Sequence, residues 1–116
     1  MTSIETIVSI INAVVLRDES IAPIGRPFAE TVSVAKRDIK KGEAFDSIGG
    51  EMIFGSLEKK EDQEKGNHLP IGIVTEGAIA KRDIKKGSLL TYDDVSLNQD
   101  SEIVKLRKIQ DDYFKL

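Results

Sequence analysis

An eight-residue segment occurs twice in this chain without a single change. Ala-Lys-Arg-Asp-Ile-Lys-Lys-Gly spans residues 35–42 and again residues 80–87, so the copies are 45 positions apart. Repeat arrays such as solenoids need roughly three units or more, whereas two copies indicate two related halves packed about a pseudo-twofold axis. The repeat therefore limits the possible folds more than any other feature of the sequence.

Each copy has the composition of a turn that follows a strand. The preceding residues, 30–34 and 77–79, place apolar side chains at alternate positions, which is typical of β-strands. Within each copy the aspartate can hydrogen-bond to its own downstream backbone, and the final glycine accepts a positive φ. We expect Ile39 and Ile84 to anchor the two turns on a common core. The repeat thus predicts a mainly β fold.

The segments between the two copies and after the second copy predict shorter elements. Residues 51–54 and 69–74 have the composition of strands, the second with a proline near its start. Residues 57–67 carry charges of mixed sign and predict either a short surface helix or a loop. Thr91 to Asp94 has capping-box spacing, which predicts one helical turn ending near Val95.

The N-terminal segment predicts an amphipathic helix. Residues 2–5 form a capping box, and one apolar stripe follows, made of Ile4, Ile7, Val8, Ile11, Val14 and Val15. A helix of this length needs tertiary packing to persist, so the stripe must be covered. Two interpretations remain open: the stripe packs on its own β unit, or it docks on a neighbouring domain or a second copy of the chain.

A shorter helix is predicted at the other end, with an apolar stripe formed by Ile103, Leu106, Ile109 or Gln110, and Tyr113. Residues 21–27 contain two prolines and a glycine and predict a structured linker. The expected organisation is an N-terminal helix and linker over residues 1–20, a β domain over 21–98 and a C-terminal helix over 99–116.

Composition excludes several functions. The formal net charge is −3 and no aromatic residues alternate with basic ones, so we expect no nucleic-acid partner. No apolar run is long enough to cross a membrane, and we expect a cytoplasmic protein. The chain has no cysteine and a single histidine, His68, which restricts metal binding and nucleophilic catalysis.

Five residues are candidates for binding a small ligand: Lys36, Arg37, Lys81, Arg82 and Glu76. The two Lys-Arg pairs lie at the start of the two copies and could hold an acidic or phosphorylated molecule, because Arg offers a planar donor fork and Lys a mobile charge. Alternatively they are solvated residues at strand ends, neutralised by the neighbouring Asp38 and Asp83.

No catalytic residue and no metal site is predicted. His68 lacks a second histidine or a cysteine, and is interpreted as a loop residue. Asp93 and Asp94 are adjacent, but neighbours in a helical turn do not face the same side, so a structural role is expected.

The two copies, the second continuing as Ser88-Leu89-Leu90-Thr91-Tyr92-Asp93-Asp94-Val95, resemble the SAF family over roughly residues 30–97. This is the β-clip domain found at the end of sialic acid synthases, in type III antifreeze proteins and in flagellar P-ring chaperones. An antifreeze function is not expected, because ice-binding faces in that branch are flat and rather apolar, and these repeats carry Lys, Arg and Asp.

A closer resemblance takes in the flanks, through Ile-Ala-Pro-Ile-Gly at 21–25, Asp-Ser-Ile-Gly-Gly at 46–50, Leu-Pro-Ile-Gly at 69–72 and Glu-Gly at 76–77. These blocks are similar to the C-terminal SAF domain of homoserine-dehydrogenase-like, NAD(P)-dependent oxidoreductases. The chain itself has no Gly-x-Gly-x-x-Gly turn after a strand. The resemblance therefore implies that NAD(P) is bound by a catalytic partner domain or subunit, and that this chain binds no cofactor.

The resemblance leads to two hypotheses. In the first, the chain is a non-catalytic accessory domain or small subunit that helps to assemble or close the active site of a catalytic oxidoreductase, with homo-oligomers formed through the N-terminal helix. In the second, it is a self-contained module for a sugar acid or sugar phosphate, like the small subunit of altronate-type dehydratases. We do not expect the chain alone to be an enzyme.

Overall fold

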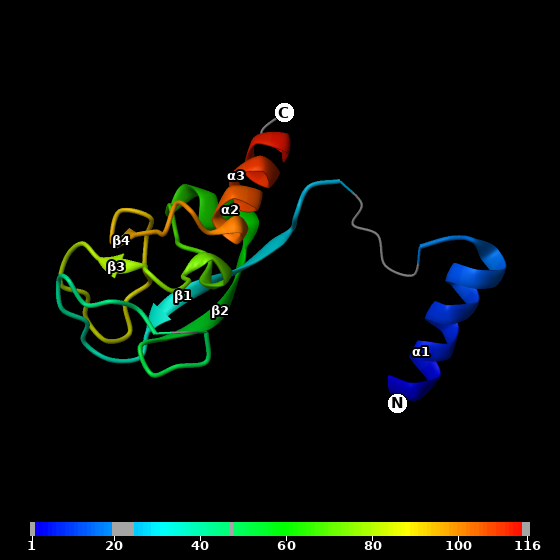
Figure 1. The fold of residues 1–116 in the computed structure, drawn as a ribbon, viewed down its shortest axis with the longest axis horizontal. Coiled ribbons are helices and arrows are strands. Elements are labelled where there is room, and N and C mark those ends of the chain that lie inside the picture. The colour runs from blue at the N-terminus through cyan, green and yellow to red at the C-terminus, as the bar shows by residue number, and fades with distance from the viewer. Residues whose placement is uncertain (1, 20–24, 47, 115–116) are drawn as a thin grey trace.

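The computed structural model describes residues 2–19, 25–46 and 48–114. Figure 1 shows the elements in chain order. They are the helix α1 (Thr2–Ile11) with a π-helical turn η1 (Asn12–Leu16), the strands β1 (Ala29–Ala35) and β2 (Ile53–Lys59), the helix α2 (Lys60–Lys65), a 3₁₀ turn η2 (Ile71–Ile73), the strands β3 (Ile79–Ala80) and β4 (Val95–Ser96), and the helix α3 (Glu102–Phe114).

The body of the protein is built around β1, whose β-branched residues Thr31, Val32 and Val34 favour an extended backbone. On one side β1 pairs with the antiparallel β2. On the other side Ser33 accepts a hydrogen bond from the amide of Leu90 at 2.9 Å and donates one to the carbonyl of Leu69 at 2.8 Å. A second antiparallel pair, β3 with β4, completes the sheet structure. The small antiparallel sheets and few helices fit the predicted mainly β class.

The two copies of the repeat lie against each other. The amide of Ile39 donates to the carbonyl of Ile84 at 2.9 Å, and the amide of Ile84 donates to the carbonyl of Ile39 at 2.8 Å. Both isoleucine side chains are buried, in one cluster with core residues such as Phe45, Leu69 and Leu90. The prediction that these isoleucines anchor the turns on the core is confirmed.

The turn aspartates correct one sequence prediction. Each was expected to bond to its own downstream backbone, and this is wrong. Asp38 instead accepts a hydrogen bond from the amide of Lys86 at 2.9 Å, and Asp83 accepts one from the amide of Lys41 at 2.9 Å. The reason is that the paired isoleucines bring the tip of each turn beside the aspartate of the other.

The segment 69–74 was predicted to be a strand, and this is also wrong beyond its first residues. Pro70 forms an isolated bridge to Val32, after which the chain turns into η2. Proline has no N–H to continue a strand ladder, and Gly72 in η2 adds conformational freedom. The segment 57–67, left open by the sequence, first completes β2 and then forms α2. Acidic residues in the first turn of α2 and Lys65 in its last turn suit the helix dipole.

Both predicted terminal helices form, but α3 does not use its predicted apolar face. Ile103 and Leu106 are 45% and 58% exposed, whereas Val104 is buried. Arg107 lies on the Val104 side, where it binds Glu30 of β1. The helix is therefore held by the burial of Val104 and by ion pairs, and a search for apolar periodicity does not detect the ion pairs.

The helix α1 lies apart from the body (Figure 1). Among the described residues α1 contacts no element except η1. The predicted stripe is exposed along its whole length, from Ile4 at 66% to Val15 at 70%. Part of the predicted linker, residues 20–24, lies outside the described residues.

Candidate functional site

The arginines of the two predicted Lys-Arg pairs are each neutralised by a carboxylate other than the neighbouring aspartate that the sequence suggested. Arg37 donates to Glu43 at 2.8 Å, and Arg82 bonds to Asp94. The hydrogen bond that Arg37 donates to Glu43 raises the pKa of Arg37, and the one that Arg82 donates to Asp94 raises the pKa of Arg82. The neighbouring Asp38 was expected to neutralise Arg37, but its carboxylate is bound to Lys85 at 3.1 Å.

The other three predicted residues are dispersed. The ammonium of Lys36 donates to the carbonyl of Gly50 at 2.5 Å, and that of Lys81 to the carbonyl of Tyr92 at 3.4 Å. Glu76 is exposed, and its backbone carbonyl accepts a bond from Asn98. No hydrogen bond or ion pair among the described residues joins these three to one another or to the two arginines. Their role in ligand binding stays a prediction.

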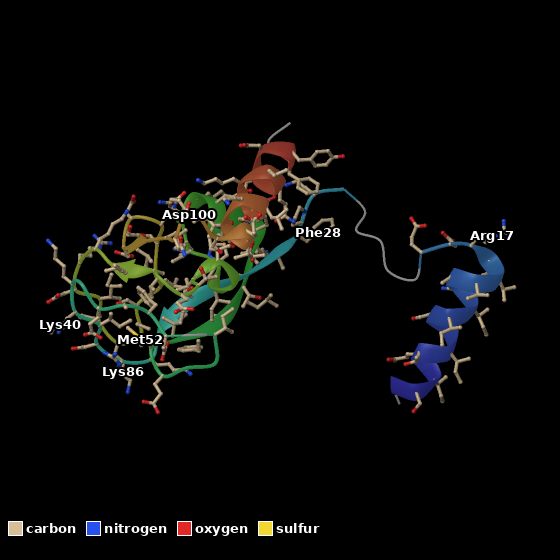
Figure 2. The ribbon with its side chains drawn as sticks, viewed as in Figure 1. Arg17, Phe28, Lys40, Met52, Lys86 and Asp100 are labelled. Atoms are coloured by element: carbon tan, nitrogen blue, oxygen red, sulfur yellow. The ribbon has the colours of Figure 1, made fainter. Side chains whose placement is uncertain are left out.

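Figure 2 shows that Lys40 and Lys86, at the tips of the two turns, lie close together at one end of the body. Lys40 forms an ion pair with Asp83 at 3.3 Å, and the reciprocal pair, Lys85 with Asp38, measures 3.1 Å. The backbone amide of Lys86 and the ammonium of Lys85 lower the pKa of Asp38. These charges serve the contact between the turns.

Asp94 has the structural role expected from the sequence, and His68, interpreted there as a loop residue, lies in an isolated β-bridge to Thr91. The Nδ1 atom of His68 lies 2.7 Å from Oε2 of Glu58 on β2. Asp94 accepts hydrogen bonds from the amide of Thr91 at 2.7 Å and from its hydroxyl at 2.9 Å. Burial opposes ionisation of Asp94, but the bonds from Arg82 and Thr91 outweigh it, and the pKa lies below its ordinary value. The predicted helical turn here is a hydrogen-bonded turn without a helix.

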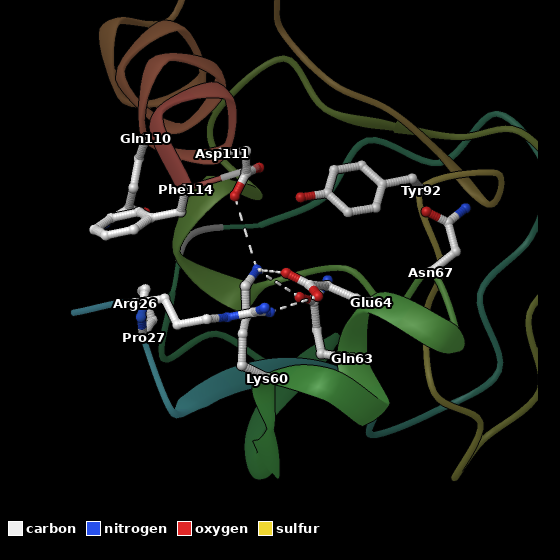
Figure 3. A pocket seen from close by; sticks show the side chains of 10 residues that line it. All are labelled: Arg26, Pro27, Lys60, Gln63, Glu64, Asn67, Tyr92, Gln110, Asp111 and Phe114. Atoms are coloured by element: carbon white, nitrogen blue, oxygen red, sulfur yellow. Dashed lines mark hydrogen bonds and ion pairs between the residues drawn. The ribbon is translucent and has the colours of Figure 1, made fainter. Parts of the chain in front are cut away.

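A cavity of about 500 Å³ lies elsewhere, between α2, α3 and the turn that carries Tyr92. We call it the α2–α3 pocket (Figure 3). It is lined by Arg26, Pro27, Lys60, Gln63, Glu64, Asn67, Tyr92, Gln110, Asp111 and Phe114. Two cations and two carboxylates balance each other, and three amides, one phenol, one phenyl ring and one proline complete the lining.

Lys60, the first residue of α2, is the most enclosed charged group of this pocket, with a side chain only 9% exposed. Its ammonium donates to Oε1 of Gln63 at 2.8 Å. The carboxylates of Glu64 and Asp111 lie 3.6 Å and 3.7 Å away, too far for hydrogen bonds but close enough for ion pairing. Lys60 thus forms ion pairs with two carboxylates, but among the described residues only Gln63 accepts a hydrogen bond from its ammonium.

The ion pairs continue on both sides of Lys60. Arg26 binds Glu64 at 2.9 Å, and Asp111 accepts a hydrogen bond from Arg107 at 3.0 Å. Arg107 in turn binds Glu30 at 2.5 Å. This chain of alternating charges fixes α3 to α2 and β1, and so holds the walls of the pocket in place.

Tyr92 points its hydroxyl toward the Asp111 side of the α2–α3 pocket (Figure 3). Burial raises the pKa of this phenol, which therefore stays neutral at physiological pH. No hydrogen bond of the hydroxyl to a described residue is present. Tyr92 thus offers both a donor and an acceptor to the cavity.

The sequence analysis named none of the ten pocket residues as candidates. They come from four separate segments, and none of them forms a motif with fixed spacing. Lys60 and Gln63 follow directly after β2, and in the structure both are buried although they are polar. Only the fold brings them to Tyr92 and Asp111.

Two apolar surfaces stand outside this pocket. One is the stripe of α1, and the other is a groove of about 260 Å³ lined by Pro70, Ile73, Ile103 and Leu106 among others. Among the described residues, no group of three or more His, Asp or Glu side chains is arranged to hold a metal ion. Within the same part of the chain, no helix has the length and apolar character needed to cross a membrane.

The family model of the SAF domain matches residues 30–96, which is more than half of the chain. The match includes both repeats, β1 to β4 and α2, and it ends before α3. No curated protein matches the sequence.

Proposed function

The chain belongs to the SAF domain family, and on that premise we propose that it is a non-catalytic accessory domain or small subunit of an NAD(P)-dependent oxidoreductase of the homoserine-dehydrogenase-like type. It helps to assemble or close the active site of a catalytic partner. The observation that carries this proposal is the exposed apolar face of α1, which contacts no other part of the described body.

The physical argument starts from the length of the helix. Isolated helices shorter than roughly 12–15 residues are marginal in water, and α1 has 10 residues followed by a π-helical turn of 5. Eight large apolar side chains on α1 and η1 are between 45% and 71% exposed. A partner that buries them would stabilise the helix and gain the hydrophobic free energy of their burial, roughly 1.5–3 kcal/mol for each fully buried side chain.

The body suits a supporting role. We propose that the two repeats form a β-clip whose halves are related by a pseudo-twofold axis, and the reciprocal bonds between Ile39 and Ile84 support this. Of the predicted cations, Arg37 and Arg82 are held by carboxylates and Lys36 and Lys81 by backbone carbonyls, which favours packing over ligand chemistry. The described residues contain no glycine-rich turn between a strand and a helix that would cradle a dinucleotide. We propose that NAD(P) is bound by the catalytic partner and that the complex is cytoplasmic.

Two substitutions on α1 test the docking face. Ile7→Glu places a charge in the stripe, and Ser9→Glu places the same charge on the opposite face of the same helix. Light scattering of the purified chain measures self-association through the helix. We expect a dimer or larger assembly for the wild type and Ser9→Glu, and a monomer for Ile7→Glu.

The partner is tested by affinity capture on the purified chain, followed by an assay of NAD(P)H absorbance. The proposal expects a captured protein with a Gly-x-Gly-x-x-Gly turn whose dehydrogenase activity rises when the wild-type chain or Ser9→Glu is added, but not Ile7→Glu. Substrate turnover by the chain alone would contradict a non-catalytic role. So would a partner whose activity is indifferent to the charge at position 7.

The alternative, a self-contained module for a sugar acid or sugar phosphate, is tested by isothermal titration. Such a module requires cations that are free to bind the ligand. In the structure Arg37 and Arg82 each have a carboxylate partner, which argues against this alternative. Clear binding of sugar acids that is lost in Arg37→Ala or Arg82→Ala would favour the module over the accessory domain.

A further inference from the structure

The α2–α3 pocket contains a cation whose partners select for one kind of ligand group. Lys60 has three N–H donors and only one acceptor within hydrogen-bond distance among the described residues, the amide oxygen of Gln63. Its other two neighbours, Glu64 and Asp111, stand at 3.6 Å and 3.7 Å. An oxygen atom that enters this space meets an ammonium donor and two carboxylate acceptors together.

Only a group that both accepts and donates hydrogen bonds satisfies all three partners. A hydroxyl accepts from Lys60 and donates to a carboxylate, as water does. A ligand carboxylate or phosphate can accept from Lys60, but it would be repelled by Glu64 and Asp111, and the arginine partner of each carboxylate reduces this repulsion without removing it. We propose that the α2–α3 pocket binds an uncharged polyhydroxylated molecule, of the class of monosaccharides and sugar alcohols, through hydroxyl groups placed beside Lys60.

The rest of the lining fits the same class of ligand. Asn67 and Gln110 offer amide groups that donate and accept, and the neutral phenol of Tyr92 does the same. Phe114 and Pro27 offer apolar surface for the C–H groups of a sugar ring. The volume of about 500 Å³ lies within the roughly 300–1,000 Å³ typical of small-molecule sites. The balance of two cations and two carboxylates again favours a ligand without net charge.

The experiment is an NMR titration of the ¹⁵N-labelled full chain. The probes are D-glucose, D-ribose and D-mannitol, with D-gluconate and D-glucose 6-phosphate as charged counterparts of one of them. The side-chain amides of Gln63, Asn67 and Gln110 report directly on the pocket. We expect at least one neutral polyol to shift these signals in a saturable way, and the two charged counterparts to bind more weakly than glucose.

Two matched variants separate pocket binding from general effects. Tyr92→Phe removes the hydroxyl that faces the cavity, and Tyr113→Phe removes one from an exposed tyrosine that does not line it. We expect Tyr92→Phe to raise the Kd about fivefold, equivalent to the loss of one hydrogen bond of about 1 kcal/mol, and Tyr113→Phe to leave the Kd unchanged. Neither change removes a charge, so both proteins should fold.

Three results would overturn the proposal. The first is that no neutral polyol shifts the pocket amides up to its solubility limit. The second is that gluconate or glucose 6-phosphate binds the same amides more tightly than glucose. The third is that both tyrosine variants weaken binding equally. None of these outcomes bears on the docking of α1, which is measured separately by the variants at positions 7 and 9.

Discussion

Replacement of Arg107 by alanine tests whether α3 is held by its charged face. Arg107 donates to Glu30 at 2.5 Å and to Asp111 at 3.0 Å, and the Arg107 and Glu30 side chains are only 14% and 16% exposed. Exposed ion pairs contribute up to about 1 kcal/mol, whereas removing one partner of a fully buried pair costs about 3–5 kcal/mol. Because this pair is mostly buried, we expect Arg107→Ala to lower the free energy of unfolding by about 2–3 kcal/mol.

The neighbouring Leu106 is the control, because it belongs to the apolar stripe that the sequence predicts. It is 58% exposed, so Leu106→Ala should cost no more than about 0.5 kcal/mol. For a body of this size, about 1 kcal/mol shifts the melting temperature by about 4–8 °C, so Arg107→Ala should melt about 10–20 °C below the wild type. Circular dichroism in a thermal scan and in urea measures both variants.

Arg107→Lys adds a third point to the series. Lysine keeps the charge but not the planar fork that reaches Glu30 and Asp111 together, so its stability should fall between wild type and alanine. Hydrogen exchange of the α3 amides shows whether the loss is local to the helix. If Leu106→Ala destabilises the protein more than Arg107→Ala, α3 packs through its apolar stripe and the packing described above is incorrect.

Three further predictions concern the paired turns. The pKa of Asp38 is lowered by its bonds to Lys86 and Lys85, so this carboxylate stabilises the fold above the unfolded-state value of about 4 and ceases to do so as pH falls through the folded-state pKa; melting temperatures measured from pH 7 to pH 2 should fall in acid, and less steeply for Asp38→Asn. The buried Ile39 changed to alanine should lose about 2–5 kcal/mol in urea unfolding, and the 58% exposed Ile48 less than about 0.5 kcal/mol, so equal losses would contradict the core assignment. Gly42 has φ of +87° with open space around it, so Gly42→Ala should destabilise by about 1 kcal/mol through backbone strain alone, whereas Gly72→Ala, also in open space but without a positive φ, should be neutral or stabilising when both are followed by thermal melting.

The sequence predicts those parts of the fold whose signals are local. The strand over 30–34 is predicted by alternation, and it forms within β1. Gly42 and Gly87 are predicted to have positive φ, and their values are +87° and +81°. The buried positions of the turn isoleucines also follow from the repeat itself. In each case the determinant lies within a few residues of the position predicted.

Non-local contacts account for the errors. The pairing of Asp38 with Lys86 joins residues 48 positions apart, and no local rule distinguishes it from a bond to the next turn. The charged face of α3 is turned toward the body because Arg107 binds Glu30, a residue 77 positions earlier in the chain. The α2–α3 pocket escapes prediction for the same reason, because the environment of Lys60 is created by Asp111 and Tyr92, which the sequence places far away.

The reciprocal bonds between the turns also make each copy of the repeat depend on the other. A single copy of the octapeptide would expose the amide and carbonyl of its isoleucine and the carboxylate of its aspartate, all of which are satisfied here by the other copy. Loss of either copy would therefore leave these groups of the other copy without their partners, so the two turns can form only together.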